Sequence, residues 1–437
     1  MKKLWMPIAA FFLLSWSVLA YLDVYYREFS FQSTFVRSSF VILLSFMIVI
    51  IIRYFGLLLF SYLNYVFPHV PDPTPELTSF PLVTVIVPAF NESKNIEVSL
   101  KSVLAIDYPN MEILLMDDGS TDGTAALAAP YAGVHPNGTV TIVSDRNKGK
   151  PAVLNRGVAL STGEFILCMD ADAVLAPNVI RLMLPHFMDP KVGAVAGNIK
   201  VSNRDNMLCR LQALEYVVGQ NTVRRAQSFF NIVNVIPGTL GVFRRTAMRE
   251  AGGYDHDTFA EDTDLTIKLL DLGWKVQCAP DAFAWTESPE DVTGIMRQRY
   301  RWTRGILQTV LKHQNMLWRP DIRGAALWLL AFESVVWPPM NMFAYFFFVF
   351  VASTQHVMHP IILWWIQLSL LDMVTSLHCV AMDNEWLVLV PYSVIFRFYF
   401  VIIIDVGKVF SIMEEFMGIQ MRWDQIARKG KAAVTRS

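Results

Sequence analysis

Long apolar runs lie at both ends of the chain and enclose a middle part with the alternating polarity of a globular protein. A membrane-spanning helix needs about 20 mostly apolar residues. Runs of this kind fall at 4–22 and within 40–67, and again at 325–352, from 357 to about 373, and from 386 to about 412. The pattern predicts about two spans in residues 1–66, then two to three spans plus an interfacial helix in residues 321–415, and a basic tail at 416–437.

A proline-rich stretch separates the first membrane segment from the middle part. Residues 67–81, FPHVPDPTPELTSFP, carry prolines at 68, 71, 73, 75 and 81, which exclude a helix and predict a stiff linker. The globular domain then covers 82–320. Residues 1–20 also have the basic start and apolar centre of a cleaved signal peptide. With two spans retained or one removed, the positive-inside rule delivers residue 82 to the cytosol.

Composition agrees with a membrane protein. The chain is 54% hydrophobic and only 17% charged, and its net charge of -1 gives no reason to expect nucleic acid as a partner. The four cysteines lack the paired spacing of a zinc site or a disulfide framework.

Within the middle part, apolar strands alternate with helical patterns. Four strands are predicted, in VTVIVPAFNE (83–92), MEILLMDDGSTDGT (111–124), GTVTIVSD (138–145) and GEFILCMDAD (163–172). This order predicts an α/β domain with a mostly parallel sheet covered on both faces. We expect Asn91 to cap the helix that follows the first strand.

Carboxylates follow two of these strands, at the edge where such sheets bind ligands. They are Asp117 and Asp118, and Asp170 and Asp172. One aspartate alone is common in turns, but Asp170 and Asp172 offer two hard oxygen donors suited to a divalent cation that also holds phosphate. In NKGKPAVLN (147–155), Lys148 or Lys150 is available for a phosphate or a uracil edge. These features together predict a metal-bound nucleoside diphosphate as ligand.

A third acidic group lies in FAEDTDL (259–265), ahead of a helical pattern. Carboxylates at a helix N-terminus are favoured by the helix dipole without any further role. Gly252 and Gly253 upstream and Trp285 downstream are compatible with a binding site instead, in which a carboxylate acts as general base on a hydroxyl.

The order FNE, DDGS, DAD, AEDTDL and QRYRW (298–302) resembles the inverting family 2 glycosyltransferases, specifically the membrane-embedded processive synthases of cellulose, hyaluronan, chitin and poly-N-acetylglucosamine. The resemblance covers about 82–320, and residues 298–302 match the family's QxxRW pattern in full. It implies a GT-A-type domain that binds a nucleotide diphospho-sugar and is flanked by transmembrane helices.

The resemblance also implies roles for the donor-side residues. Asp118 would contact the uridine, and Asp170 and Asp172 would approach the diphosphate, with Asp172 the main ligand of Mg²⁺ or Mn²⁺. Asn91, Glu92 and Lys150 fall among the donor-binding positions, and Arg301 would neutralise the leaving diphosphate.

On the acceptor side, Asp262 would deprotonate the acceptor hydroxyl, Gln298 would bind the acceptor, and Trp302 would stack on its sugar. The family commonly has Thr where this chain has Ala260, so a hydroxyl contact is missing there. For Arg297 and Arg299 we expect a simpler role, contact with anionic lipid head groups.

The implied function is inverting transfer of a sugar from a UDP-sugar to a growing β-linked polysaccharide, coupled to export across a bacterial inner membrane. Overall features look most like the biofilm exopolysaccharide enzymes that make poly-β-1,6-N-acetylglucosamine, with N-acetylglucosamine as the sugar. Hyaluronan, chitin-oligosaccharide and β-glucan synthases remain alternatives. The implied partners are the donor, the polysaccharide acceptor, membrane lipid and a small membrane accessory subunit.

Two other classes of protein stay open. A non-processive transferase acting on a lipid carrier would share DDGS and DAD but would not need QxxRW. A non-catalytic scaffold or transporter would explain the apolar runs but not the converging carboxylates. Glu333, Asp372, Arg397 and Asp405 lie in the apolar runs, where charge is costly. They are expected either to line a polysaccharide channel, or to lie near span ends or pair with one another.

Overall fold

The computed structural model describes residues 34–70, 77, 79–355, 359–419 and 430. The first predicted span, 4–22, lies outside these residues. So do most of the linker between 71 and 78 and most of the basic tail.

The described residues form one nine-stranded sheet in the order β3-β4-β2-β1-β5-β8-β7-β9-β6. The four predicted strands are confirmed as β1 (Val83–Ala89), β2 (Met111–Asp117), β4 (Gly138–Ser144) and β5 (Phe165–Cys168). They pair in parallel as β4-β2-β1-β5. The second half of the sheet is mixed, because β8 (Gly241–Arg244) is antiparallel to both β5 and β7 (Val192–Val201), whereas β9 (Lys275–Thr286) is parallel to β7. The edge strands are β3 (Gly133–His135) and β6 (Ala173–Leu175).

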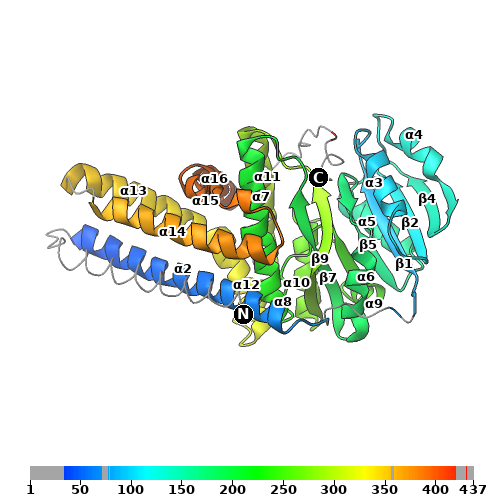
Figure 1. Ribbon diagram of the computed structural model, residues 1–437, viewed down its shortest axis with the longest axis horizontal. Helices are drawn as coiled ribbons and strands as arrows, with labels where there is room; N and C mark the ends of the chain where they lie inside the picture. Colours follow the sequence, from blue (N-terminus) through cyan, green and yellow to red (C-terminus); the bar gives the residue numbers. More distant parts are fainter. Residues whose placement is uncertain (1–33, 71–76, 78, 356–358, 420–429, 431–437) are drawn as a thin grey trace.

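Helices cover the sheet on both faces (Figure 1). Those of the globular part are α3 (Ile96–Leu104), α4 (Thr124–Ala128), α5 (Lys150–Leu160), α6 (Val179–Met183), α7 (Met207–Glu215), α8 (Thr222–Phe229), α9 (Arg245–Glu250), α10 (Glu261–Asp271) and α11 (Val292–Lys312). A π-helical turn, Tyr216–Asn221, joins α7 to α8.

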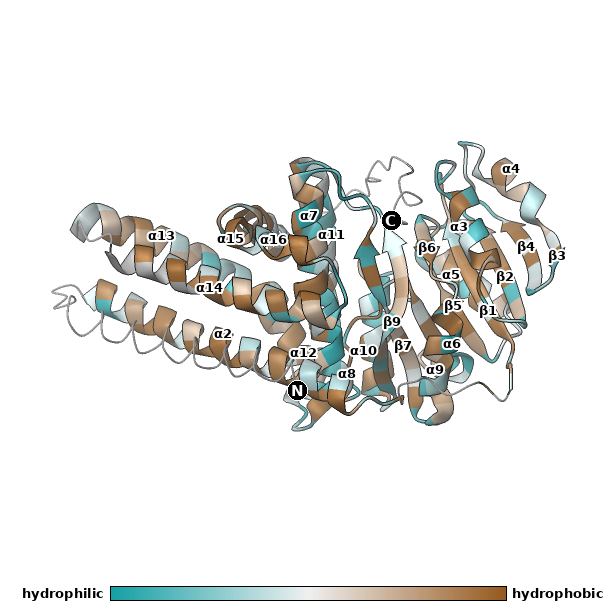
Figure 2. Ribbon diagram, viewed as in Figure 1, coloured by the Kyte–Doolittle hydropathy of each residue, from teal (hydrophilic) through white to brown (hydrophobic). Residues whose placement is uncertain are grey.

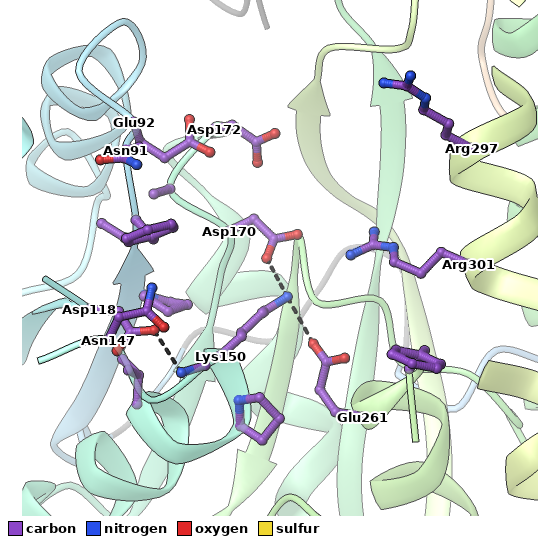
Figure 3. Close-up of a pocket in the computed structure, with 18 of the residues that line it drawn as sticks. Asn91, Glu92, Asp118, Asn147, Lys150, Asp170, Asp172, Glu261, Arg297 and Arg301 are labelled. Carbon is purple, nitrogen blue, oxygen red and sulfur yellow. Dashed lines mark hydrogen bonds and ion pairs between the residues drawn. The ribbon is translucent and has the colours of Figure 1, made fainter. Parts of the chain in front are cut away.

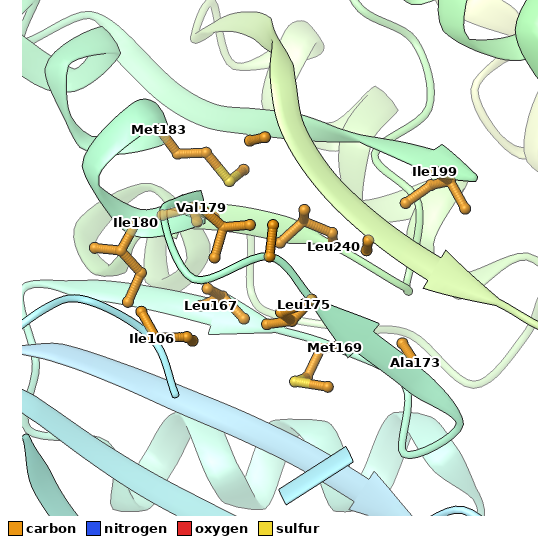
Figure 4. Close-up of a cluster of buried hydrophobic side chains, with 14 of the residues drawn as sticks. Ile106, Leu167, Met169, Ala173, Leu175, Val179, Ile180, Met183, Ile199 and Leu240 are labelled. Carbon is orange, nitrogen blue, oxygen red and sulfur yellow. The ribbon is translucent and has the colours of Figure 1, made fainter. Parts of the chain in front are cut away.

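Successive side chains of a strand point to opposite faces of the sheet, so a strand with apolar residues at consecutive positions is buried on both faces. Val83, Val85 and Val87 of β1 belong to one apolar cluster, and Ile86 belongs to the cluster on the opposite face. Part of the first cluster is shown in Figure 4, where α6 and the segment around β6 pack over the sheet. This packing fixes the carboxyl ends of β1, β2 and β5, from which the candidate site is built.

The membrane part contains α2 (Thr34–Val66), α12 (Ile322–Ala331), α13 (Trp337–Gln355), α14 (His359–Met382), α15 (Tyr392–Ile395) and α16 (Ile402–Phe416). By length and composition, the described stretches able to cross a membrane are Thr34–Val66, Ile322–Thr354 and Leu387–Phe416. Helices α2, α13 and α14 run side by side away from the sheet, and their surfaces are largely apolar (Figures 1 and 2). Helix α16 is seen nearly end on in Figure 1, so it crosses the direction of that bundle and packs on α11 and α13.

The ionisable residues of the apolar segments are held in polar pairs. Arg397 donates two hydrogen bonds to Asp372, at 2.6 and 2.8 Å. Arg53 donates to Glu333 at 2.6 Å, and Asn341 donates to Asp405 at 2.9 Å. Of the four residues, Asp372 and Arg397 pair with one another, whereas Glu333 and Asp405 are held by Arg53 and Asn341. These contacts satisfy groups that would be costly in hydrocarbon if isolated.

Candidate active site

A cavity of about 1550 Å³ lies between the carboxyl ends of the parallel strands and helix α11. Its strand-side wall contains Asn91, Glu92, Asp118, Asp170 and Asp172. Its opposite wall contains Arg297 and Arg301, whose side chains point across the cavity toward the carboxylates (Figure 3). The carboxylates predicted at the strand ends therefore do converge on one site.

Asn91 and Asp118 hold the loops at the strand ends together. Asn91 has a positive φ of 55°, and its Oδ1 accepts a hydrogen bond from the backbone N–H of Thr121 at 2.8 Å. It does not cap the following helix as expected, because α3 begins only at Ile96. The Asp118 carboxylate accepts from the backbone N–H groups of Lys148 and Gly149, at 2.8 and 2.9 Å.

A glycine is required in the turn between these loops. Gly119 has φ +74°, and a Cβ there would come within 2.9 Å of the backbone nitrogen of Asn147. The close approach lets the turn after β2 lie against the loop before α5. The Gly of the DDGS sequence thus positions both sides of the donor end of the cavity.

Lys150 lies at the centre of the acidic groups. Its Nζ is 2.7 Å from Asp170 Oδ1 and 3.1 Å from Glu261 Oε1, as Figure 3 shows. Burial lowers the pKa of Lys150, but the charges of Asp170 and Glu261 outweigh burial and raise it above its usual value. Lys150 is therefore a permanent cation that partly neutralises the acidic side of the cavity.

Glu261 was not singled out from the sequence, although it is the residue of the AEDTDL segment that lines the large cavity. Glu261 and Asp262 are adjacent at the start of α10, and adjacent side chains on a helix point about 100° apart. The pair therefore indicated that one of the two carboxylates would face the cavity more directly than the other. Asp262 instead lines a small adjoining cavity together with Lys150 and Glu261.

The Asp262 carboxylate is fixed by backbone groups. Oδ1 accepts from the N–H of Thr263 at 2.7 Å, and Oδ2 accepts from the N–H of Gly238 at 3.3 Å. Burial and then the charge of Glu261 raise the pKa of Asp262 to about 6, against the lowering effect of Lys150. A carboxylate with such a pKa accepts a proton more readily than an ordinary aspartate near neutral pH.

Two groups of acidic residues could hold a metal ion, and a lysine contacts each of them. Asp255, Asp257 and Asp264 bring carboxylate oxygens within 4.8 Å of one another. Lys312 Nζ, however, lies 2.6, 2.7 and 3.1 Å from these three carboxylates, so this group is held together by a lysine. Asp170 and Asp172 line the large cavity instead, and their hard oxygen donors fit a divalent cation that also contacts a diphosphate.

The side chains of the RQRYRW segment (297–302) lie on two faces of helix α11. Arg297, Tyr300 and Arg301 line the cavity. Gln298 is buried outside the cavity lining, and Trp302 packs against the apolar core. The structure thus brings Arg301 to the cavity wall, but not the predicted acceptor-binding residues Gln298 and Trp302.

The expectation of lipid contact is wrong for Arg299, whose side chain is only 2% exposed. It donates to Glu215 of α7 at 2.5 Å, and its guanidinium lies 4.3 Å from the ring centroid of Trp302. Arg297 lines the cavity instead of facing away from it. The cluster of cations and rings therefore has one face toward the cavity and one toward the protein core.

Comparisons with known proteins agree with this site. Residues 81–305, a little over half of the chain, match the family described as "Glycosyltransferase like family 2". The chain is 31% identical over 256 residues to the poly-beta-1,6-N-acetyl-D-glucosamine synthase of Staphylococcus epidermidis, covering 58% of this chain and 61% of that protein. The corresponding synthase of Staphylococcus aureus (strain COL) is 31% identical over 255 residues with the same coverage.

Among solved structures, the mannosyltransferase PcManGT from Pyrobaculum calidifontis, in complex with GDP-Man and Mn²⁺, aligns with a TM-score of 0.63 at 23% identity. The alignment covers 84% of this chain and 97% of that one, which confirms the GT-A-type α/β fold. The chain spans about three fifths of the length of the curated relatives that it matches. This chain, with its strand-end carboxylates facing two arginines and its three described stretches long and apolar enough to cross a membrane, belongs to glycosyltransferase family 2.

Proposed function

We propose that this glycosyltransferase transfers N-acetylglucosamine from UDP-N-acetylglucosamine to a growing β-linked polysaccharide with inversion at the anomeric carbon. The observation that carries the proposal is the cavity in which strand-end carboxylates face Arg297 and Arg301. Similarity to the staphylococcal synthases supports the choice of sugar.

The donor would lie along the strand ends. The loops that Asn91 and Asp118 hold would receive the uridine, with Glu92 beside them on the cavity wall. Asp172 and Asp170 would hold Mg²⁺ or Mn²⁺, which would supply positive charge to the diphosphate. Lys150 keeps the charge of Asp170 partly compensated, and Arg301 stabilises the negative charge that develops on the departing UDP.

Asp262 acts as the general base. Its raised pKa suits removal of a proton from the acceptor hydroxyl, which attacks the anomeric carbon from the face opposite UDP. The hydroxyl oxygen forms the new glycosidic bond, the bond to the diphosphate breaks, and the proton goes to Asp262. Inversion of an α-linked donor then gives a β-linkage.

For the membrane part we propose that α2, α13 and α14 span the bilayer and that α16 lies at its cytosolic surface. Helix α14 is not among the three described stretches that meet the length and composition of a span, which include α16 within Leu387–Phe416. The 24 residues of α14 nevertheless give a length of about 36 Å, enough to cross the hydrocarbon core. With α13 and α14 as a pair of spans, the basic tail returns to the cytosolic side, whereas three C-terminal spans would place it outside, against the positive-inside rule. The end of α16 also contacts the catalytic domain, since Arg304 of α11 donates to the carbonyl of Ile419 at 2.6 Å.

Export of the product across a bacterial inner membrane, with a small accessory subunit, completes the proposal. Because Glu333, Asp372, Arg397 and Asp405 are engaged in pairs, we assign them to helix packing and not to a channel wall. A passage for the polysaccharide would then need other surfaces of the spanning helices or those of the accessory subunit.

The test is UDP release by the purified full-length protein in detergent with Mg²⁺ or Mn²⁺. UDP-N-acetylglucosamine, UDP-glucose and UDP-glucuronate are offered in parallel, with Asp262→Asn as the control. Turnover with UDP-N-acetylglucosamine alone, lost in the control, supports the proposal. Turnover with another donor would show that a different sugar is transferred. Transfer of a single sugar to a lipid phosphate would favour a lipid-carrier transferase.

A further inference from the structure

The cavity is larger than the donor requires. Binding sites for small ligands commonly have volumes of roughly 300–1,000 Å³, whereas this cavity has about 1550 Å³. Its strand end holds the donor-side carboxylates, and its far end is formed by Gly407, Phe410 and Glu414 of α16. Space therefore continues from the reaction centre to a helix of the membrane part.

These three residues share one face of α16. Their spacing of three and then four residues places them in line along the helix. A Cβ on Gly407 would meet nothing within 4 Å, so the cavity is open at that point. Phe410 exposes 57% of its surface, and Glu414 accepts a hydrogen bond from the hydroxyl of Tyr300 on α11.

The face is held rigidly against α11. Arg304 donates to Glu415 at 2.5 Å and to the hydroxyl of Tyr300 at 2.8 Å. Gln308 donates to the other oxygen of Glu415 at 3.0 Å. Glu415 is thus used for anchoring, while its neighbour Glu414 is turned toward the cavity with Tyr300.

We propose that Gly407, Phe410 and Glu414, together with Tyr300, form the subsite for the acceptor saccharide. Aromatic rings bury the flat C–H faces of sugars, and a carboxylate accepts hydrogen bonds from their hydroxyl groups. The rings of Tyr300 and Phe410 line this part of the cavity, whereas Trp302 lies beneath Arg299 outside the cavity lining. This inference rests on the proposed function and assigns the acceptor end of the same site.

The experiment measures binding of a β-linked N-acetylglucosamine pentamer to the full-length protein in detergent by calorimetry. Phe410→Ala removes the ring, and Gly407→Leu fills open space without deleting a contact. Phe416→Ala is the matched control, since Phe416 lies on the same helix, is 68% exposed and is absent from the cavity lining. UDP binding to each variant is measured in parallel.

We expect about tenfold weaker pentamer binding in Phe410→Ala and at least as large a loss in Gly407→Leu. The control and the UDP affinity of every variant stay unchanged. A pentamer that fails to bind the unaltered protein, or that binds both variants as tightly as the control, overturns the subsite. Pentamer binding that depends on this face, in protein that releases no UDP from any donor, supports the subsite and refutes the proposed donor chemistry.

Discussion

Arg299 is predicted to stabilise the fold through Glu215, although its sequence context suggests a contact with lipid. The pair joins α11 to α7, with side-chain exposures of 2% and 18% and a distance of 2.5 Å. Removing one partner of a buried pair typically costs roughly 3–5 kcal/mol, because the other charge stays buried without compensation. Burial already raises the pKa of Glu215, and the charge of Arg299 is the main factor that opposes this.

Arg299→Met should therefore destabilise the protein by a few kcal/mol and also loosen Trp302, over which the guanidinium lies. Replacing both partners, as in Arg299→Met with Glu215→Met, should recover most of the loss, since apolar replacement of a whole buried pair is often neutral. A double-mutant cycle on thermal unfolding in detergent gives the coupling energy, which we expect to be about 2 kcal/mol or more.

The alternative is a surface arginine that binds anionic head groups. In that case Arg299→Met would leave unfolding unchanged and would weaken association with vesicles containing anionic lipid. A coupling energy near zero in the cycle, with an effect on vesicle binding alone, would refute the reasoning from the buried pair.

Three further predictions concern charge in the cavity. Because the pKa of Asp262 is raised from 3.8 to about 6, its ionised form costs about 3 kcal/mol of folding free energy above that pKa and nothing below about pH 4. Asp262→Asn should therefore abolish UDP release yet raise the unfolding temperature by an amount that grows from about pH 4 to about pH 6 and then levels off, and a pH-independent difference would contradict this. Lys150→Met removes the cation that lowers the pKa of Asp262, so the acid limb of the pH profile of UDP release should move to higher pH. Lys150→Arg keeps the cation and should leave the acid limb where it is. Asp172→Asn should remove the dependence of UDP release on Mn²⁺, while Asp257→Asn should leave it intact because Lys312 already neutralises that carboxylate.

The strand-rich half of the catalytic domain could be predicted from sequence because its signals are local. Runs of apolar residues followed by polar residues and carboxylates predicted the four parallel strands. They also predicted the edge of the sheet at which Asp118 and Asp170 both lie. Strands β7, β8 and β9 depend on pairing between residues far apart in the chain, antiparallel between β7 and β8 and parallel between β7 and β9, and no local pattern encodes that order. Asn91 was expected to act as a helix cap, yet its amide is used by a loop 30 residues away.

The site residues that were predicted wrongly lie on helices, and the error concerns which face of the helix each side chain takes. Neighbouring residues on a helix point about 100° apart, so the pair Glu261 and Asp262 cannot face one cavity equally, nor can Arg301 and Trp302. A motif fixes which residues are present, but the face that each takes depends on what packs against the helix. For α11 those partners are α7 and α16, neither of which the motif reveals.

The same contacts explain why the catalytic and membrane parts act as one unit. The acidic wall of the cavity belongs to the sheet, whereas the cationic wall belongs to α11. Gly305 of α11 passes the start of α10 so closely that a Cβ would lie 2.5 Å from the backbone nitrogen of Ala260. On its other side α11 is tied to α16 through Arg304 and Glu415. The distance between the two walls, and hence the fit of a diphosphate between them, is therefore set jointly by the sheet and by a helix of the membrane part.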